Sequence, residues 1–185
     1  MRIISGKYKG RHFDVPRTFK ARPTTDFAKE NLFNILNNII DFEKCSSLDL
    51  FSGTGSISLE FLSRGCKEVL SVEMDSLHFS FLKKCQHTLG DNNWRIVRDD
   101  VFRFIKRCNN SYDIVFADPP YALRELGTIP DLVFESNLLD ENGILIFEHG
   151  KDYNFEEHPH FMRHVSYGSV NFTFFCKKKE ATQQS

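Results

Sequence analysis

The sequence lacks the features of a membrane protein, a disulfide-bonded secreted protein or a zinc protein. No apolar run approaches the roughly 18 residues that a bilayer requires, and the N-terminus has no apolar signal-peptide core. The five cysteines are odd in number, widely spaced and form no Cys-x-x-Cys pair, as is typical of reduced thiols. The spacing of His158, His160 and His164 could hold a metal, but no cysteine or convincing carboxylate completes the set. We therefore expect a cytoplasmic protein without a bound metal.

Net charge is also nearly absent, at −1 over 185 residues, but the charges are unevenly distributed. Residues 1–25 hold seven Lys or Arg side chains against one acid, a balance of +6, so the rest of the chain carries −7. A basic end on an acidic body is typical of a protein that grips a polyanion, although a solubilising terminus would look the same. The candidate contacts to nucleic acid are Lys7, Lys9, Arg11, Lys20 and Arg22.

Short apolar runs alternate with amphipathic stretches along most of the chain, in a sequence that is 41% hydrophobic. A helix is expected after Thr24-Thr25-Asp26, where Asp26 suits the positive end of the helix dipole. Further strands are predicted at Ser47–Phe51, Glu68–Val72, Trp94–Val97, Asp113–Ala117 and Gly143–Phe147, with helices between them at Ser56–Ser63, Leu77–Leu89, Val101–Arg107 and about Asp131–Leu139. This alternation predicts an α/β fold with a parallel sheet and helices on both faces.

The two ends of the chain have a different pattern. Residues 2–15 predict two short strands around a glycine-containing turn, with basic side chains interleaved. His164–Cys176 predicts an antiparallel pair joined at Tyr167-Gly-Ser169. We therefore divide the chain into a basic β-hairpin extension, residues 1–20, and a main domain, residues 21–180.

A glycine loop follows the first predicted strand of the main domain. Two glycines between a strand and a helix let the backbone turn tightly and approach a ligand. A dinucleotide-binding loop would have a third glycine where Ser58 stands, and Asp49 would repel a pyrophosphate. A ligand with a positive ammonium group suits Asp49 better. The candidate cofactor residues of this loop are Asp49, Phe51, Ser52, Gly53, Thr54 and Gly55.

Acids also follow the second and third strands of the predicted sheet. Glu73 lies 20 residues past the first glycine, where an acid can accept hydrogen bonds from both ribose hydroxyls. Met74 can cover an adenine face, and Asp100, beside Val101, can accept from the adenine amino group; Asp99 is the alternative, and any of these acids could instead cap a helix. A nucleoside with a positive amino-acid group and no phosphate is S-adenosylmethionine, which we expect as the cofactor.

The fourth predicted strand ends in Asp118-Pro119-Pro120-Tyr121, which could be only a strand running into a loop. Beside a methyl donor, however, each part has a role. An exocyclic amino group is a poor nucleophile because its lone pair is delocalised into the base. Asp118 and the Pro119 carbonyl can accept its two hydrogens, and the rigid Pro-Pro unit keeps that carbonyl in place. Tyr121 can stack on an unpaired base. Asp118 should also border the cofactor if the strand order reverses between the first and fourth strands.

The chain resembles the amino-directed class I methyltransferases and, more narrowly, the RsmD family of bacterial ribosomal RNA methyltransferases. The resemblance is carried by Arg2–Arg11, Arg22-Pro-Thr-Thr-Asp26, Lys29-Glu30, Leu32-Phe33-Asn34, Leu48–Gly55, Glu73-Met-Asp75 and Asp118–Tyr121. Phe27 departs from it, because the family often has a basic residue there.

This resemblance implies a Rossmann-like, doubly wound and mostly parallel seven-stranded sheet with an antiparallel C-terminal strand. It implies methylation of the N2 amino group of a guanine in 16S ribosomal RNA, with S-adenosyl-L-homocysteine as product. It also implies a monomer without an obligate protein partner, acting on an assembling 30S subunit with its basic hairpin on the RNA.

Three alternatives share part of this pattern. A DNA adenine-N6 methyltransferase has the same turn but normally needs an added recognition domain, for which 185 residues leave little room. A catalytically silent RNA-binding assembly factor would not need the intact Asp118–Tyr121 turn. An NAD-dependent oxidoreductase is disfavoured by Asp49 and Ser58.

Overall fold

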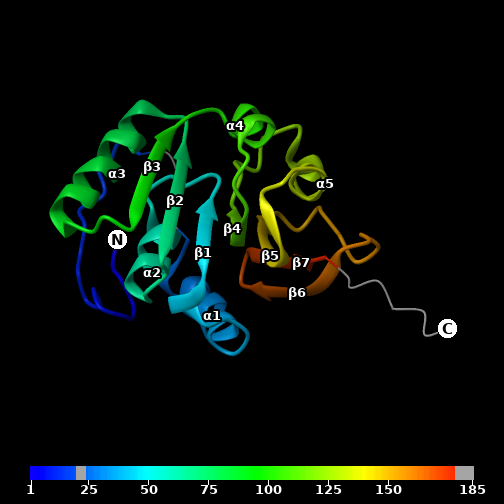
Figure 1. The fold of residues 1–185 in the computed structure, drawn as a ribbon, viewed down its shortest axis with the longest axis horizontal. Helices are drawn as coiled ribbons and strands as arrows, with labels where there is room; N and C mark the ends of the chain where they lie inside the picture. The colour runs from blue at the N-terminus through cyan, green and yellow to red at the C-terminus, as the bar shows by residue number, and fades with distance from the viewer. Residues whose placement is uncertain (20–23, 178–185) are drawn as a thin grey trace.

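The computed structural model describes residues 1–19 and 24–177. Within these residues seven strands form one sheet, and five α-helices lie against its two faces (Figure 1). The strands are β1 (Ser46–Asp49), β2 (Glu68–Glu73), β3 (Trp94–Arg98), β4 (Tyr112–Ala117), β5 (Leu139–His149), β6 (Phe161–Tyr167) and β7 (Val170–Cys176). The helices are α1 (Asp26–Asn37), α2 (Ser56–Ser63), α3 (Ser76–Leu89), α4 (Val101–Arg107) and α5 (Ile129–Glu135), with 3₁₀ turns at Phe42–Lys44 and Leu126–Thr128. No helix in the described part of the chain is both long enough and apolar enough to cross a membrane.

The strand order is β3-β2-β1-β4-β5-β7-β6. Strands β1 to β5 run parallel to one another, and β7 is antiparallel to both β5 and β6. The predicted fold, a doubly wound and mostly parallel sheet with an antiparallel C-terminal strand, is confirmed. The order reverses between β1 and β4, as the interpretation of the Asp118 turn required.

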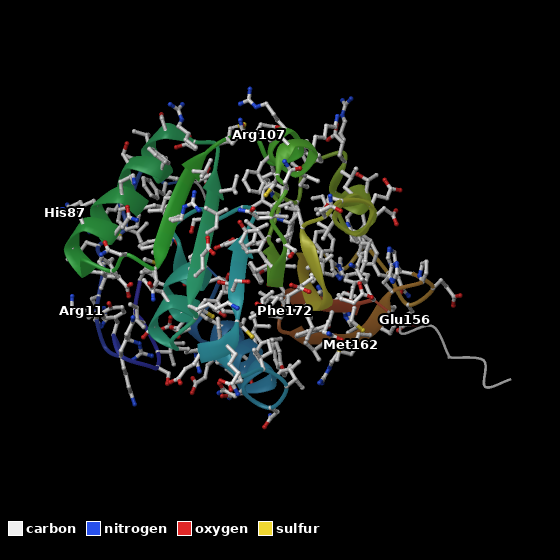
Figure 2. All side chains as sticks on the ribbon, in the orientation of Figure 1. Arg11, His87, Arg107, Glu156, Met162 and Phe172 are labelled. Atoms are coloured by element: carbon white, nitrogen blue, oxygen red, sulfur yellow. The ribbon has the colours of Figure 1, made fainter. Side chains whose placement is uncertain are left out.

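Apolar side chains alternate between two core layers along each central strand. On β4, Ile114 and Phe116 pack in the layer of α1, α2 and α3, whereas Val115 and Ala117 pack in the layer of α4 and α5. Phe172 of β7, labelled in Figure 2, belongs to the first layer. Because both faces are covered, the central strands need nearly continuous apolar sequences, which is why the pattern predicted them well.

The helix expected over about Asp131–Leu139 was placed too late. Helix α5 begins at Ile129 with Pro130 in its first turn, where a proline disturbs no helical hydrogen bond. It ends at Glu135, and Leu139 instead pairs with Tyr112 at the start of β5. Leu138 and Leu139 would fit either a helix or a strand, and the pairing of Leu139 with Tyr112 of β4 places Leu139 in a strand.

The N-terminal segment forms one antiparallel bridge, between Arg2 and His12, in place of two regular strands. Figure 1 shows it beside α2 and α3, far from β6. Ile3 is buried in the core, and the Lys7 amide donates to the Ser63 carbonyl at the end of α2 at 2.7 Å. Gly6 has a φ of +83°, and a Cβ there would lie 1.9 Å from the Ser63 carbonyl oxygen. Only glycine allows the segment this close to α2.

A buried ion pair fastens this segment to the helices. The Lys29 side chain, 1% exposed on α1, lies 3.3 Å from the Glu60 carboxylate of α2 and donates to the Arg2 carbonyl at 2.7 Å. Glu60 also accepts from the Ile4 amide at 2.6 Å. Burial lowers the pKa of Lys29, and the Glu60 charge opposes that shift.

Replacing Lys29 with alanine is expected to lower the free energy of unfolding by about 3 kcal/mol or more, since Glu60 would lose a buried partner. Lys44→Ala is the matched control, because Lys44 pairs with Asp41 on the surface and should have no measurable effect. Urea titrations followed by circular dichroism would compare the two variants. Similar small effects would show that Lys29 does not anchor the segment.

Candidate active site

A cavity of about 810 Å³ lies at the carboxyl edge of the sheet, lined by the loops after β1, β2, β3 and β4 and by Glu148 near the end of β5. In open α/β sheets this carboxyl edge, near the reversal of strand order, is the usual position of ligand sites. The structure brings nearly all the predicted cofactor and catalytic residues together here. Those that line the cavity are Asp49, Phe51, Ser52, Gly53, Thr54, Glu73, Met74, Asp100, Val101, Asp118, Pro119, Pro120 and Tyr121.

Gly55 is the predicted residue that does not line the cavity. It has a φ of +76° at the start of α2, and a Cβ there would lie 2.5 Å from the Leu82 side chain. Position 55 therefore needs a glycine so that α2 can pack closely against α3. Gly53, with a φ of +52°, forms the turn that borders the cavity.

Glu73 shapes the glycine loop. Its carboxylate accepts from the Gly53 amide at 2.7 Å and from the Asp75 amide at 2.8 Å. A carboxylate has about four acceptor positions, so Glu73 keeps capacity for hydroxyl groups in the cavity. The loop and the predicted ribose acceptor are thus one hydrogen-bonded unit.

Asp49 is buried at the end of β1 with an incomplete set of partners. Its Oδ2 accepts from the Ser58 hydroxyl at 2.6 Å, and its Oδ1 has no hydrogen-bond partner among the described residues. Burial raises the pKa of Asp49 to about 7, and the nearby Glu73 charge adds to this. A buried acceptor without a partner fits a cationic or hydrogen-bond-donating ligand group.

Ser58 is held in turn by a chain of buried donors. The Trp94 indole donates to the Ser71 hydroxyl at 2.8 Å, and the Ser71 and Ser58 hydroxyls are 2.7 Å apart. Since an indole can only donate, the chain is directed from Trp94 toward Asp49. Serine at the third-glycine position therefore has a structural task that glycine could not perform.

The two acids after β3 have different surroundings. Asp100 caps α4 by accepting from the Arg103 amide at 2.9 Å and also lines the cavity. Asp99 is buried and ion-paired with the Arg103 and Arg107 side chains. Of the two, Asp100 is the one available to a ligand, and Met74, which is exposed, borders the same cavity.

Asp118 lies beside Asp49 because β1 and β4 are paired. The Leu50 amide donates to the Phe116 carbonyl at 2.9 Å, two residues before Asp118. Burial raises the pKa of Asp118 well above its usual range, and the charges of Glu148 and Asp49 raise it further. No described residue hydrogen-bonds to its carboxylate, which therefore remains an acceptor for a ligand.

Glu148 is the site residue that the sequence interpretation missed. It lies near the end of β5, is 5% exposed and accepts from the Tyr121 hydroxyl at 3.3 Å. Burial raises its pKa to about 7. An acid directly after the apolar run Ile144–Phe147 resembles the acids that end β1 and β2 and the acid that follows β4, and that signal could have identified it.

The predicted RNA-binding residues are only partly free. Lys7 pairs with Asp91 at 2.6 Å, and the Tyr8 hydroxyl donates to the same carboxylate. Lys9 and Arg11 are exposed, and Figure 2 shows Arg11 at the periphery of the molecule. Lys20 and Arg22 lie outside the described residues.

Comparison with known proteins identifies the relatives of this chain. The family described as Conserved hypothetical protein 95 matches residues 1–176. The chain belongs to this family. The ribosomal RNA small subunit methyltransferase D of Escherichia coli strain K12 is 37% identical over 148 residues, which cover 80% of this chain and 71% of the relative. The resemblance found in the sequence is confirmed.

Solved structures of other proteins share the fold of this chain, a member of the family described as Conserved hypothetical protein 95. The yhhF protein of Escherichia coli has a TM-score of 0.84 at 29% identity, with 97% of this chain and 99% of that chain covered. An RNA methyltransferase of Salinibacter ruber, in complex with S-adenosyl-L-homocysteine, has a TM-score of 0.66 at 14% identity, with 89% and 100% covered. The sheet of this family member is therefore a class I methyltransferase fold.

Asp49→Asn is expected to stabilise the ligand-free protein at pH 8 by about 2–4 kcal/mol, because it removes a buried charge. The folded pKa, about 7, lies above the ordinary 3.8, so wild-type stability falls as pH rises between those values and is constant above them. The difference between variant and wild type should therefore be absent below pH 4 and complete above pH 7, as measured by chemical denaturation. Asp152→Asn, at an exposed position, is the control. A difference independent of pH would contradict the assignment.

Proposed function

We propose that this protein transfers a methyl group from S-adenosylmethionine to the N2 amino group of a guanine in 16S ribosomal RNA. The observation that carries the proposal is the placement of Asp49 and Asp118 in one cavity: a buried acceptor for a cationic cofactor beside an acceptor for an amino group. The name of the Escherichia coli relative, ribosomal RNA small subunit methyltransferase D, supports the choice of RNA.

The residues of the cavity fit the cofactor. The Oδ1 of Asp49, buried without a partner, suits its ammonium group, and Glu73 has acceptor positions left for the ribose hydroxyls. Met74 and Val101 would border the adenine, with Asp100 accepting from its amino group. When bound, the cofactor supplies an electrophilic methyl group on a sulfonium. The acids contribute a negative field that attracts a cation and would repel a pyrophosphate.

Amine activation would fall to the Asp118 turn. Asp118 and the Pro119 carbonyl would accept hydrogen bonds from the two amino hydrogens, so that the nitrogen lone pair faces the methyl group. The one proton that the nitrogen loses on methylation would pass to the Asp118 carboxylate. Pro119 and Pro120 fix the backbone before the base arrives, which places the acceptors without reorganisation. Tyr121, which is half exposed beside the cavity, would stack on the base.

The RNA itself would be held outside the cavity. Lys9 and Arg11 are exposed and would contact phosphates from a segment that hydrogen bonds hold to α1 and α2; the Arg11 guanidinium also lies 5.5 Å from the centre of the Tyr8 ring. The proposed setting is a monomer in the cytoplasm, acting on an assembling 30S subunit.

Methyl transfer to small-subunit particles from a strain lacking this gene would test the proposal. With labelled S-adenosylmethionine, wild-type protein should modify one guanine at N2, identified by mass mapping of the RNA. Asp118→Ala should lower the single-turnover rate by roughly 10²-fold or more, while Asp118→Asn should retain more activity because its amide oxygen still accepts. Asp152→Ala should behave as wild type. Near-normal transfer by Asp118→Ala would refute the catalytic assignment, and methylated adenine would refute the choice of base.

The exposed basic residues of the N-terminal segment, Lys9 and Arg11, are expected to contribute to RNA binding. The double variant Lys9→Ala/Arg11→Ala should weaken RNA binding and lower the slope of log affinity against log salt by roughly one to two, as fewer counterions are released. Lys7 is left in place because it pairs with Asp91. Lys83→Ala/Lys84→Ala, two exposed lysines of α3, is the charge-matched control. An equal change of slope in both variants would show that only net charge matters.

A further inference from the structure

The cavity continues past the cofactor loop and the Asp118 turn toward β5 and β7. Its far part is lined by Thr24 and Thr25 before α1, by Tyr121, by Glu148, and by Ser169 and Val170 at the turn between β6 and β7. The total volume, about 810 Å³, lies in the upper part of the range of ligand sites. This end is where a base presented to the Asp118 turn would lie.

The register of the sheet fixes the order of the acids along the cavity. Phe116 pairs with Ile146 and Ala117 with Phe147, so the next positions on the parallel strands are Asp118 and Glu148. Neighbouring strands are about 4.8 Å apart. Asp49 lies on the other side of Asp118, since β1 is the other neighbour of β4. Asp118 is therefore flanked by the cofactor acid on one side and by Glu148 on the other.

Glu148 has no cationic partner in the described part of the chain that would explain an acid at this position. Within the described residues no Lys, Arg or His side chain forms an ion pair with it, and its Oε2 has no hydrogen-bond partner. Its side-chain contacts are uncharged: the Tyr121 hydroxyl donates to Oε1 at 3.3 Å, and hydrogen bonding with the Thr24 hydroxyl opposes the rise of its pKa. A buried carboxylate without a cation lowers stability, so its position at the cavity indicates a ligand contact.

A ligand contact at Glu148 would distinguish guanine from adenine. A guanine presents two adjacent donors, the N1–H and the N2 amino group, whereas an adenine presents its amino group beside an N1 that only accepts. The Asp118 turn accepts from an amino group and so cannot distinguish them. A carboxylate one strand away would meet a donor in guanine and a lone pair in adenine.

We infer that Glu148 selects guanine by accepting a hydrogen bond from N1–H of the base whose N2 amino group is held by the Asp118 turn. The inference rests on the proposed function and adds the residue that chooses the base. In the free protein the Tyr121 hydroxyl holds the Glu148 carboxylate. When the base arrives, N1–H becomes a donor to that carboxylate and the Tyr121 ring stacks on the base.

Substitution of the target guanine by 2-aminopurine tests this inference, because 2-aminopurine keeps the N2 amino group but has an acceptor at N1. Small-subunit RNA would be reassembled with either base at the guanine mapped by mass. Wild-type protein should methylate guanine roughly 100-fold faster or more, as expected when a buried hydrogen-bonding group faces the wrong partner. Glu148→Gln should slow guanine methylation. It should also lower the ratio of the guanine rate to the 2-aminopurine rate to below about 10-fold, since the glutamine amide can donate to N1 of 2-aminopurine.

The controls separate this role from others. Glu141→Gln lies on the same strand with an 81% exposed side chain and should keep the wild-type ratio. Cofactor affinity of Glu148→Gln, measured by calorimetry, should also equal that of wild type. If Glu148→Gln slows both substrates equally, Glu148 is structural and the inference is overturned. If wild-type protein binds the cofactor but methylates no guanine, the proposed function is refuted, and the inference, which depends on it, is refuted as well.

Discussion

The pairing of β1 with β4 is the constraint on which the site depends. Parallel pairing of Asp49 with Phe116, across the reversal of strand order, brings the loops after both strands to one edge of the sheet. Each neighbouring strand adds an acid at the same edge: Glu73 from β2 and Glu148 from β5. Local sequence cannot bring these acids together, because they come from strands far apart in the chain.

That concentration of acids is unfavourable for the fold, and the structure shows how it is tolerated. Burial raises the pKa of Asp49, Asp118 and Glu148, and the charges of neighbouring acids raise those of the first two further. Elsewhere buried charge is paired, as with Lys29 and Glu60. Buried acids that are paired with a cation hold elements of the fold together, whereas the buried acids without a cationic partner line the cavity. A cationic ligand with hydrogen-bond donors would relieve the repulsion that the free protein retains.

The sequence predicted the elements better than their contacts. Apolar strands buried on both faces, the glycine loop and the proline-bearing turn all have local signatures, and each lies close to where it was expected. Contacts between distant residues have no such signature: nothing in the local sequence indicated that Lys7, a predicted RNA contact, pairs with Asp91. Glu148 was missed because the predicted strand ended one residue before it, whereas β5 continues to His149. The role of Ser58 became clear only through its bond to Asp49.

The buried ion pair of Lys29 links two parts of the molecule that the sequence suggested were separate. Its ammonium group contacts the Arg2 carbonyl of the N-terminal segment and the Ser56 hydroxyl, which is at the start of α2 directly after Gly55. If the N-terminal segment separated from the helices, Ile3 would become exposed, and Lys29 and Glu60 would lose their hydrogen bonds to the backbone of the segment. The proposed RNA-binding segment and the glycine loop are therefore fixed to the same helix. RNA held by Lys9 and Arg11 would be held in a constant position relative to the cofactor, and the accuracy needed to bring one base to Asp118 would follow from that rigidity.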